Sequence, residues 1–456
     1  MTSAKISRRR ALTGLAAAAA VPTLGLGSAH AAPAARRARR GRAPAEPATL
    51  PFDDPEAGHL IFVGGRVEVG DGTVHERGVV EVRGTRIVSV RAGDAGNVAG
   101  ATVIDLQGKR ITPGFIAAAT PLGLVEIDME GSTVDAERHG DPIRSGYDAS
   151  EAVHADSSLI QVSAIEGITS AAVTPRGGLL SGQVAWIDLV AGDHAGIVAK
   201  SKIAAAGQLG RTVSGSRAAT LTRLREVLDD AAVYRDKRGA FDKRQTRDLS
   251  AHRLDLEALG PVLDGEVPLV VRAHRASDLL ALVRLAKESS LRLAIIGAAQ
   301  GWKVASALAE AQIPVIVQPS SNLPQSLDQL GARMDNAARL HKAGVPVGIA
   351  VLGEAHNIRN VTQEAGLAVS YGLPHEVAIR AISLQLAQIY GMDAHYGSVA
   401  AGKVANLAVW EGDPLELSQM PQQVYVRGRA IPMRSRQTLL RDRYRDLRPF
   451  AREDDG

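Results

Sequence analysis

Eight short apolar runs constrain what this chain can fold into more than any other feature. They lie at residues 112–118, 168–174, 183–189, 199–206, 267–273, 292–298, 313–318 and 345–352. Between several of them, for example at Leu221–Leu228 and Leu279–Ala286, apolar residues recur every three or four positions, as in an amphipathic helix. Strands that alternate with helices indicate an α/β protein, and eight alternations predict a (β/α)8 TIM barrel. The alternative, a doubly wound sheet, is disfavoured because no Gly-x-Gly-x-x-Gly or Walker-type loop follows any run.

Both ends of the chain carry further strand-like runs. Residues 60–63, 78–82 and 86–90 alternate with Gly and Asp turns, and similar runs appear far downstream at residues 397–410 and 423–428. Such short strands do not fold alone. We therefore expect residues 59–112 and 396–434 to build one small β-sandwich beside a central barrel at residues 113–395.

The first residues have the features of a twin-arginine (Tat) export signal. Arg8 and Arg9 precede an apolar run from Leu15 to Leu26, and residues 29–31 are a small-residue cleavage site, so residues 1–31 form the predicted signal. The alternatives are an ordinary Sec signal or a membrane anchor, but neither this run nor any later one is long enough to span a bilayer. We expect export to the periplasm or the extracellular space. Residues 32–58 form an Ala/Pro/Arg-rich linker.

Charge and cysteine content exclude several classes of function. The four basic residues of the signal account for the whole net charge of +4, so the mature chain is close to neutral. With few aromatic residues to stack on bases, nucleic-acid binding is disfavoured. The chain has no cysteine, which excludes disulfides and thiolate metal sites. The tail at residues 435–456 alternates Arg with Asp and Glu, which predicts a solvated helix or a partner surface.

Two segments carry a resemblance to a known family. Residues 113–123 read Pro-Gly-Phe-Ile-Ala-Ala-Ala-Thr-Pro-Leu-Gly, and residues 397–407 read Gly-Ser-Val-Ala-Ala-Gly-Lys-Val-Ala-Asn-Leu. Both resemble motifs of the amidohydrolase superfamily, a group of metal-dependent hydrolases, and of its imidazolonepropionase-like branch. In the second motif Asn406 replaces the usual aspartate. The resemblance covers nearly all of residues 59–434 and implies a TIM-barrel hydrolase acting on carbon–nitrogen bonds other than peptide bonds.

The same resemblance implies a site for zinc or another divalent metal, but the ligands are replaced. The family's ligand positions at the ends of the strands here hold Ala119, Pro121, Gln208, Arg272, Gly297 and Leu352. If a small insertion is allowed, the ligand position of the eighth strand aligns with Glu354 instead of Leu352. None of the 12 histidines forms a His-x-His or His-x-x-x-His pair with another. We therefore predict a degenerate metal site, with no metal ligand and no cofactor.

The remaining polar residues give candidates for a site. Glu354 and His356 are the best acid–base pair, although Glu354 could instead pair with an arginine and His356 could cap a loop. The predicted pocket residues are Arg272, His274, Gln208 and, in an acidic loop at residues 122–158 expected to roof the site, Glu126. Arg272 would pair with Glu354 or hold a ligand carboxylate, unless it points outward.

Three hypotheses follow. The first is a hydrolase of carbon–nitrogen bonds, as the resemblance implies. The second is an exported, metal-free pseudoenzyme that binds a small ligand or a partner in the barrel pocket, and the third is a metal-free enzyme that uses Glu354 and His356. We expect a small-molecule ligand or substrate, no nucleic acid and no transmembrane segment, and the sequence is compatible with a homo-oligomer.

Overall fold

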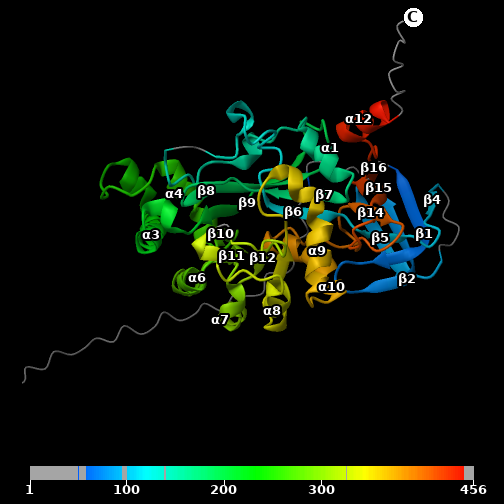
Figure 1. The fold of residues 1–456 in the computed structure, drawn as a ribbon. Coiled ribbons are helices and arrows are strands. Elements are labelled where there is room, and N and C mark those ends of the chain that lie inside the picture. The colour runs from blue at the N-terminus through cyan, green and yellow to red at the C-terminus, as the bar shows by residue number, and fades with distance from the viewer. Residues whose placement is uncertain (1–49, 51–57, 95–99, 138–139, 325, 446–456) are drawn as a thin grey trace, which may run out of the picture. The chain divides into compact units, whose positions relative to one another are not determined.

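The computed structural model describes residue 50 and residues 58–94, 100–137, 140–324 and 326–445. The predicted signal, most of the linker and the end of the charged tail lie outside the described residues. Figure 1 shows two sheets, with most of the helices around one of them. Among the described residues no helix is long and apolar enough to cross a bilayer.

All eight predicted runs become strands of one sheet. Its strands are β6 (Phe115–Thr120), β7 (Ile168–Val173), β8 (Leu180–Asp188), β9 (Val198–Gln208), β10 (Leu269–Ala273), β11 (Leu293–Gly297), β12 (Val315–Val317) and β13 (Val347–Ile349). They are hydrogen bonded in sequence order from β6 to β13. The α/β class and the eight strands of the barrel-like sheet are therefore confirmed.

The regular (β/α)8 alternation is not complete, because β8 runs antiparallel to both of its neighbours. The connections before and after β8, residues 174–179 and 189–197, contain no helix. A parallel crossover needs a dozen or more residues, so these connections can only turn the chain back. The two edge strands, β13 and β6, are not paired with each other, and the segment of residues 375–389 lies between them. In this segment the carbonyl of Ile382 accepts the backbone N–H of Ile116 at 2.9 Å.

Helices cover the outer face of this sheet. They are α1 (Ser158–Ala164), α3 (Arg217–Asp242), α6 (Ala276–Ser289), α7 (Ala305–Glu310), α8 (Asn336–Lys342), α9 (Val361–Ser370) and α10 (His375–Ala381). Shorter helices are α2 (Arg211–Ser214), α4 (Arg253–Ala258), α5 (Gly260–Leu263) and α11 (Leu384–Ile389), with short 3-10 segments in the loops. Helix α6 confirms the helical spacing predicted from the sequence, because it buries Leu279, Leu282 and Leu285 against the sheet.

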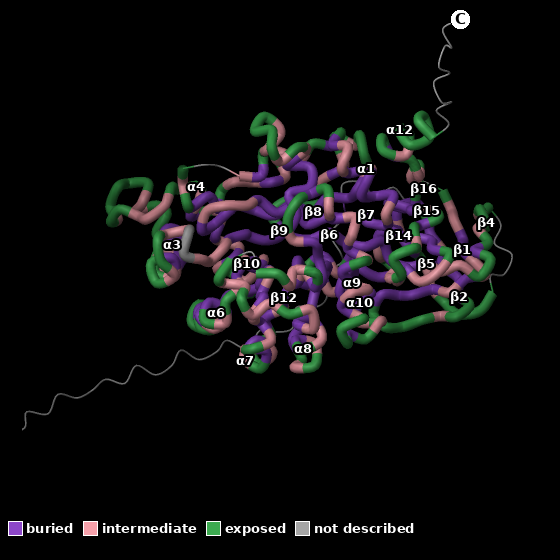
Figure 2. The backbone as a smooth tube through the Cα atoms, in the orientation of Figure 1, coloured by how far each residue is buried: buried purple, intermediate pink, exposed green. Residues whose placement is uncertain are grey.

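Two apolar clusters lie on the two faces of the barrel-like sheet, and Figure 2 shows its strands buried along most of their length. The outer cluster joins the strands to the helices. The inner cluster contains the alternate side chains of the strands together with Trp186, Tyr390 and Tyr396. The ring centroids of Trp186 and Tyr396 are 5.0 Å apart. The inside of the sheet is thus filled by side chains from the α11 segment and the strands themselves.

The second sheet combines both ends of the chain, as expected. Its strands are β1 (His59–Glu68), β2 (Val74–Arg83), β3 (Arg86–Ala92), β4 (Thr102–Asp105), β5 (Arg110–Pro113), β14 (Leu407–Trp410), β15 (Pro421–Val426) and β16 (Arg429–Ala430). The two ends meet where β5 pairs with β14, with Ile111 opposite Val409. The hydrogen bonds define one eight-stranded sheet, and its folding into a sandwich stays a prediction. Helix α12 (Arg436–Tyr444) follows, with no buried residue.

A buried polar network ties the two sheets together around Asp188, at the end of β8. The guanidinium of Arg427 donates to Asp188 Oδ2 at 2.9 Å, and Tyr396 Oη donates to the same oxygen at 3.1 Å. The amide nitrogen of Asn406 donates to Asp188 Oδ1 at 3.0 Å, while its oxygen accepts the backbone N–H of Arg427 at 2.8 Å. Asn406 thus acts as donor and acceptor at once, which an aspartate cannot do when ionised.

Candidate functional site

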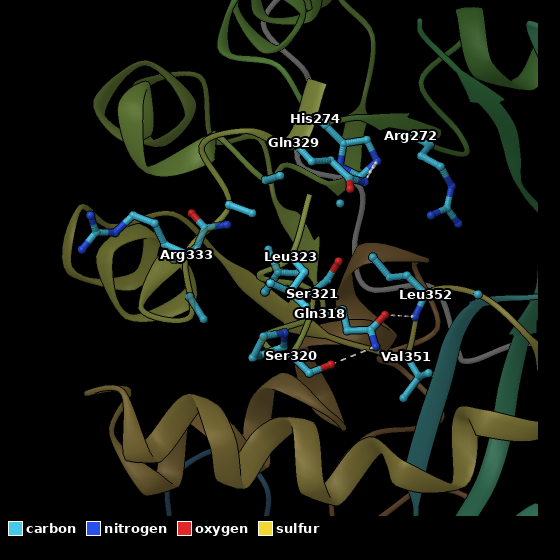
Figure 3. A pocket seen from close by; sticks show the side chains of 18 of the residues that line it. Arg272, His274, Gln318, Ser320, Ser321, Leu323, Gln329, Arg333, Val351 and Leu352 are labelled. Carbon is cyan, nitrogen blue, oxygen red and sulfur yellow. Dashed lines mark hydrogen bonds between the residues drawn. The ribbon is translucent and has the colours of Figure 1, made fainter. Parts of the chain in front are cut away.

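A pocket of about 800 Å³ opens at the carboxyl ends of β10, β11, β12 and β13 (Figure 3). This is the end of the sheet at which barrel enzymes place their sites. Polar and apolar side chains share its wall. The apolar ones include Val317, Leu323, Val351 and Leu352. The polar ones are Arg272, His274, Gln318, Ser320, Ser321, Gln329, Arg333, Asn336, Glu354 and Asn357.

A second, smaller cavity of about 40 Å³ lies beside the pocket. Four of the positions at which the family resemblance places metal ligands line it together, namely Ala119, Pro121, Gln208 and Arg272. Arg272 also lines the main pocket, so its side chain is common to both spaces. The structure therefore brings these substituted positions to one point, although they come from β9, β10 and the end of β6.

Two arginines line the small cavity, and one of them, Arg176, is paired with Asp128 at 2.8 Å. The other is Arg272. It follows three buried residues of β10, and its backbone carbonyl accepts the N–H of Leu209 at 2.9 Å. Within the described ranges its guanidinium has no carboxylate within 4.0 Å and no hydrogen-bond partner. Burial lowers the pKa of Arg272, while the nearby phenol of Tyr390 raises it slightly, and the group stays charged. The predicted pair with Glu354 is wrong for this structure, because Glu354 is turned toward His356 instead.

The phenol of Tyr390 is buried beneath this cavity. Its hydroxyl makes no hydrogen bond of good geometry, although Thr174 and the backbone of Ala119, which both line the cavity, lie close to it. Burial raises the pKa of Tyr390 to about 12, against the opposing effects of Thr174, Ala119 and Arg272. Such a neutral hydroxyl, buried and without a partner, is costly unless a ligand or water completes it.

His274 lines the main pocket and lies against Gly297. Gly297 has φ of +96°, and a Cβ there would lie 2.5 Å from Cε1 of the imidazole. Thus the ring of His274 fills the space that a side chain at position 297, the family's ligand position on the sixth strand, would need. Burial and the charge of Arg272 lower the pKa of His274 to about 4, against a small opposite effect of Asp328. The imidazole is therefore neutral at physiological pH.

The hydrogen bonds of His274 are incomplete. The amide nitrogen of Gln329 lies 3.4 Å from Nε2 and can only donate, so Nε2 accepts and Nδ1 carries the ring proton. Nδ1 is buried and has no partner. Of the predicted pocket residues, Arg272 and His274 line the main pocket, and Arg272 and Gln208 line the small cavity.

Gln318 and Ser320, which follow β12, also line the pocket, and the sequence did not predict them as site residues. Gln318 donates to Glu364 Oε1 at 2.9 Å and accepts the backbone N–H of Leu352 at 2.9 Å. Ser320 donates to the same carboxylate, through its N–H at 2.8 Å and its hydroxyl at 2.5 Å. The buried carboxylate of α9 thereby holds the loop after β12 next to the loop after β13. Gln318 could have been predicted as a site residue, because it stands at the end of the seventh predicted strand.

The predicted acid–base pair lies at the rim of the pocket. His356 Nε2 and Glu354 Oε2 are 3.1 Å apart, and the two side chains are 52% and 56% exposed. Together with Asp128 they form a group of three possible metal-ligating side chains, all of them exposed. Asp128 also makes an ion pair with Arg176 at 2.8 Å. A rim position this open to water does not resemble the dry setting that acid–base catalysis normally uses.

Glu126, predicted as a pocket residue, does not line the pocket. Its carboxylate accepts hydrogen bonds from the hydroxyls of Ser157 and Ser158 and from the backbone N–H of Ser158, at the start of α1. Burial alone would raise the pKa of Glu126, but these donors lower it. The carboxylate is needed there because the first N–H groups of a helix lack partners within the helix. Glu130 and Asp141 likewise accept backbone N–H groups of the acidic loop.

The residues at the barrel mouth do not fit a divalent metal of the kind the family uses. Such a metal needs imidazole nitrogens and carboxylate oxygens that converge with one position left for water. The small cavity offers two apolar side chains, one amide and one guanidinium at the corresponding positions. A permanent cation in the middle of the site repels a second one.

Comparison with known proteins finds a family match for part of the chain. Residues 270–431 match the sequence model of the amidohydrolase family. The chain is 23% identical over 363 residues to the amidohydrolase tasK of Hapsidospora irregularis, which covers 72% of this chain. The chain spans only 37% of the length of that relative.

Solved structures agree on the fold. The crystal structure of an amidohydrolase from Thermotoga maritima MSB8 superposes with a TM-score of 0.75 and 24% identity, covering 82% of this chain and all of the other. A molinate hydrolase superposes with a TM-score of 0.52 and 19% identity, over 86% of this chain and 97% of its own. The match over residues 270–431 and the similarity to tasK support the amidohydrolase superfamily for this chain, and the solved structures share its fold.

Proposed function

We propose that this protein uses the amidohydrolase barrel as a metal-free binding site for a small molecule. The observation that carries the proposal is the guanidinium of Arg272, unpaired by any described carboxylate and facing both cavities at the point where the family's ligand positions meet. A buried charge without a partner is expensive, so its retention is understandable if a ligand supplies the partner.

A second candidate is a hydrolase of a carbon–nitrogen bond other than a peptide bond, in the imidazolonepropionase-like branch. Membership of the superfamily supports a hydrolase in general, and the pair of Glu354 and His356 at 3.1 Å is the observation that favours it. In such a reaction Glu354 would accept a proton from water while His356 donates one to the leaving nitrogen. Both side chains would have to move from the rim toward the pocket.

Metal content tests the metal-free proposal. We expect purified, dialysed protein to contain far less than one zinc, manganese or iron per chain by plasma mass spectrometry, and its melting temperature to be unchanged by a chelator. The variant Glu354→Gln/His356→Gln serves as the matched control, because it removes the exposed group at the rim and nothing in the small cavity. One tightly held metal per chain that persists in this variant would overturn the metal-free proposal.

We further propose that the protein is exported by the Tat route, on the strength of Arg8 and Arg9 ahead of an apolar run. Changing both residues to lysine should abolish export of the folded protein, measured by immunoblot of the periplasmic and culture fractions. The matched control is Arg36→Lys/Arg37→Lys, which makes the same change in the linker. Undiminished export of the first variant would contradict the Tat assignment.

A further inference from the structure

Arg272 and its surroundings indicate what kind of molecule the pocket takes. Among the described residues, the other ionised side chains of the main pocket are Arg333, which pairs with Asp335 at 2.6 Å, and Glu354, which lies at the rim. In the small cavity at the inner end, the described charged side chains are Arg272 and Arg176, and Arg176 is already paired with Asp128. A site of this kind favours an anion, because a planar guanidinium binds a planar carboxylate through two parallel hydrogen bonds.

The size of the small cavity limits which group can enter. Its volume is about 40 Å³, and one water molecule needs about 10–15 Å³ by the same kind of measure. The cavity thus has room for about three atoms of that size, which is the number of heavy atoms in a carboxylate. A larger anionic group would have to remain in the main pocket.

Neutral donors complete the same cavity. The side-chain amide of Gln208 lines it and has no hydrogen-bond partner among the described residues. Tyr390, which is 2% exposed, lies behind the lining residues Thr174 and Ala119, and its hydroxyl makes no hydrogen bond of good geometry with them. One negatively charged group placed here would give Arg272 and Gln208 the partner that they lack among the described residues, with the buried Tyr390 hydroxyl close by.

The wall next to Arg272 indicates the chemistry of the adjoining part of the ligand. Val317, Val351 and Leu352 line the main pocket, and Figure 3 shows Val351 and Leu352 on the side toward which the arginine extends. The carbon atoms that follow the carboxylate would therefore contact aliphatic side chains.

We propose that the small cavity takes the carboxylate of an organic acid, bound by Arg272 with Gln208 and Tyr390 as neutral donors, and that its aliphatic carbons lie against Val351 and Leu352 in the main pocket. This inference rests on the proposed function, since the carboxylate occupies the place that a metal would take in the family.

Titration with a matched pair of probes tests the proposal. Sodium butyrate carries the charge, and butyramide has nearly the same shape without it. We expect butyrate to bind saturably in ligand-observed nuclear magnetic resonance at constant ionic strength, and at least about tenfold tighter than butyramide. Acetate should bind about tenfold more weakly than butyrate, because it lacks two methylene groups to bury.

Variants of the full-length mature protein locate the binding. Arg272→Gln should weaken butyrate binding at least about tenfold while leaving butyramide binding within about twofold, and Arg272→Lys should retain part of the affinity. Arg333→Gln is the matched control, because Arg333 belongs to the same pocket but is paired with Asp335. It should leave the affinity within about twofold. If Arg272→Gln does not fold, the comparison of Arg272→Lys with Arg333→Lys replaces it.

Equal affinities for butyrate and butyramide would overturn the carboxylate assignment, and so would an absence of butyrate binding or an unchanged affinity in Arg272→Gln. These results would leave the metal-free pocket standing if the metal content is low. A stoichiometric metal would instead overturn the proposed function, whatever the titration shows.

Discussion

At the scale of single residues, Arg272 should reduce the stability of the ligand-free protein. Its guanidinium is largely removed from water without a described ion-pair partner, and desolvating a charge costs free energy that only a partner returns. Arg272→Met keeps the length of the side chain and removes the charge. We expect it to raise the free energy of unfolding by about 1–3 kcal/mol in urea denaturation.

Arg333→Met is the control for that measurement, because Arg333 is 41% exposed and its ion pair with Asp335 is worth little in water. It should change the free energy of unfolding by about 0.5 kcal/mol or less. A loss of about 3–5 kcal/mol in Arg272→Met would show instead that the arginine belongs to a buried ion pair.

His274 should make the stability depend on pH in a defined window. Its pKa in the folded protein is about 4, below the usual value of 6.5. The unfolded chain therefore binds the proton first, and the folded state loses stability as the pH falls from about 6.5 to about 4. The shift corresponds to a loss on the order of 2–3 kcal/mol across that window.

His274→Gln should remove this part of the pH dependence, measured as urea unfolding at pH 7, 5.5 and 4.5. His341→Gln is the matched control, because His341 lies on α8 and is not among the residues that line the pocket. Identical pH profiles for His274→Gln and the unmodified protein would contradict the assignment of the titrating group.

The sequence predicted part of the site at this scale. Arg272, His274 and Gln208 were found because they occupy motif positions at the ends of strands, where the chain register fixes their place. Tyr390 could not be found this way, since it follows a helix and reaches the cavity only through tertiary packing. Glu126 was misassigned because a carboxylate that caps a helix and one that faces a ligand look alike in the sequence.

At the scale of secondary structure elements, the apolar runs predicted every strand of the barrel-like sheet but not the direction of β8. Periodicity reports which residues are buried, whereas direction depends on the connections. The six residues at 174–179 are too few for a crossover to a parallel strand, so the length of this connection held the missing information.

The junction between the two sheets gives a prediction about Asn406. Its amide lies 3.0 Å from one oxygen of the buried Asp188, so Asn406→Asp would place two carboxylates in contact. Arg427 is already engaged with Asp188 and Asp193. We expect the variant to lose about 2–4 kcal/mol of unfolding free energy at pH 7, and to recover part of it at lower pH as a carboxylate takes up a proton.

Gln422→Glu makes the same amide-to-carboxylate change at an exposed position of β15 and should alter the unfolding free energy by about 0.5 kcal/mol or less. Equal stabilities of Asn406→Asp and this control would mean that the network around Asp188 does not require an amide. The superfamily aspartate would then be interchangeable with asparagine in this chain.

At the scale of the whole molecule, the second sheet makes the two ends of the chain depend on each other. The sequence indicated this from two sets of short strands that lacked partners nearby, whereas the specific pairing of β5 with β14 follows from register and could not be derived from either strand alone. Buried side chains of both ends form one apolar cluster, including Phe62, Ile111 and Leu407.

Removal of residues 396–456 should therefore unfold more than the part removed. The deletion takes away β14, β15 and β16, leaves the backbone edge of β5 unpaired and exposes Phe62 and Ile111 to water. It also removes Asn406 and Arg427, so Asp188 becomes a buried carboxylate without its charge partner, which costs about 3–5 kcal/mol by itself. We expect aggregation on expression, measured by the soluble fraction and by size-exclusion chromatography.

A chain that stops after Arg445 keeps both sheets and α12, and should remain soluble with an unchanged melting temperature. A soluble, cooperatively unfolding product of the longer deletion would show that the barrel does not need the shared sheet.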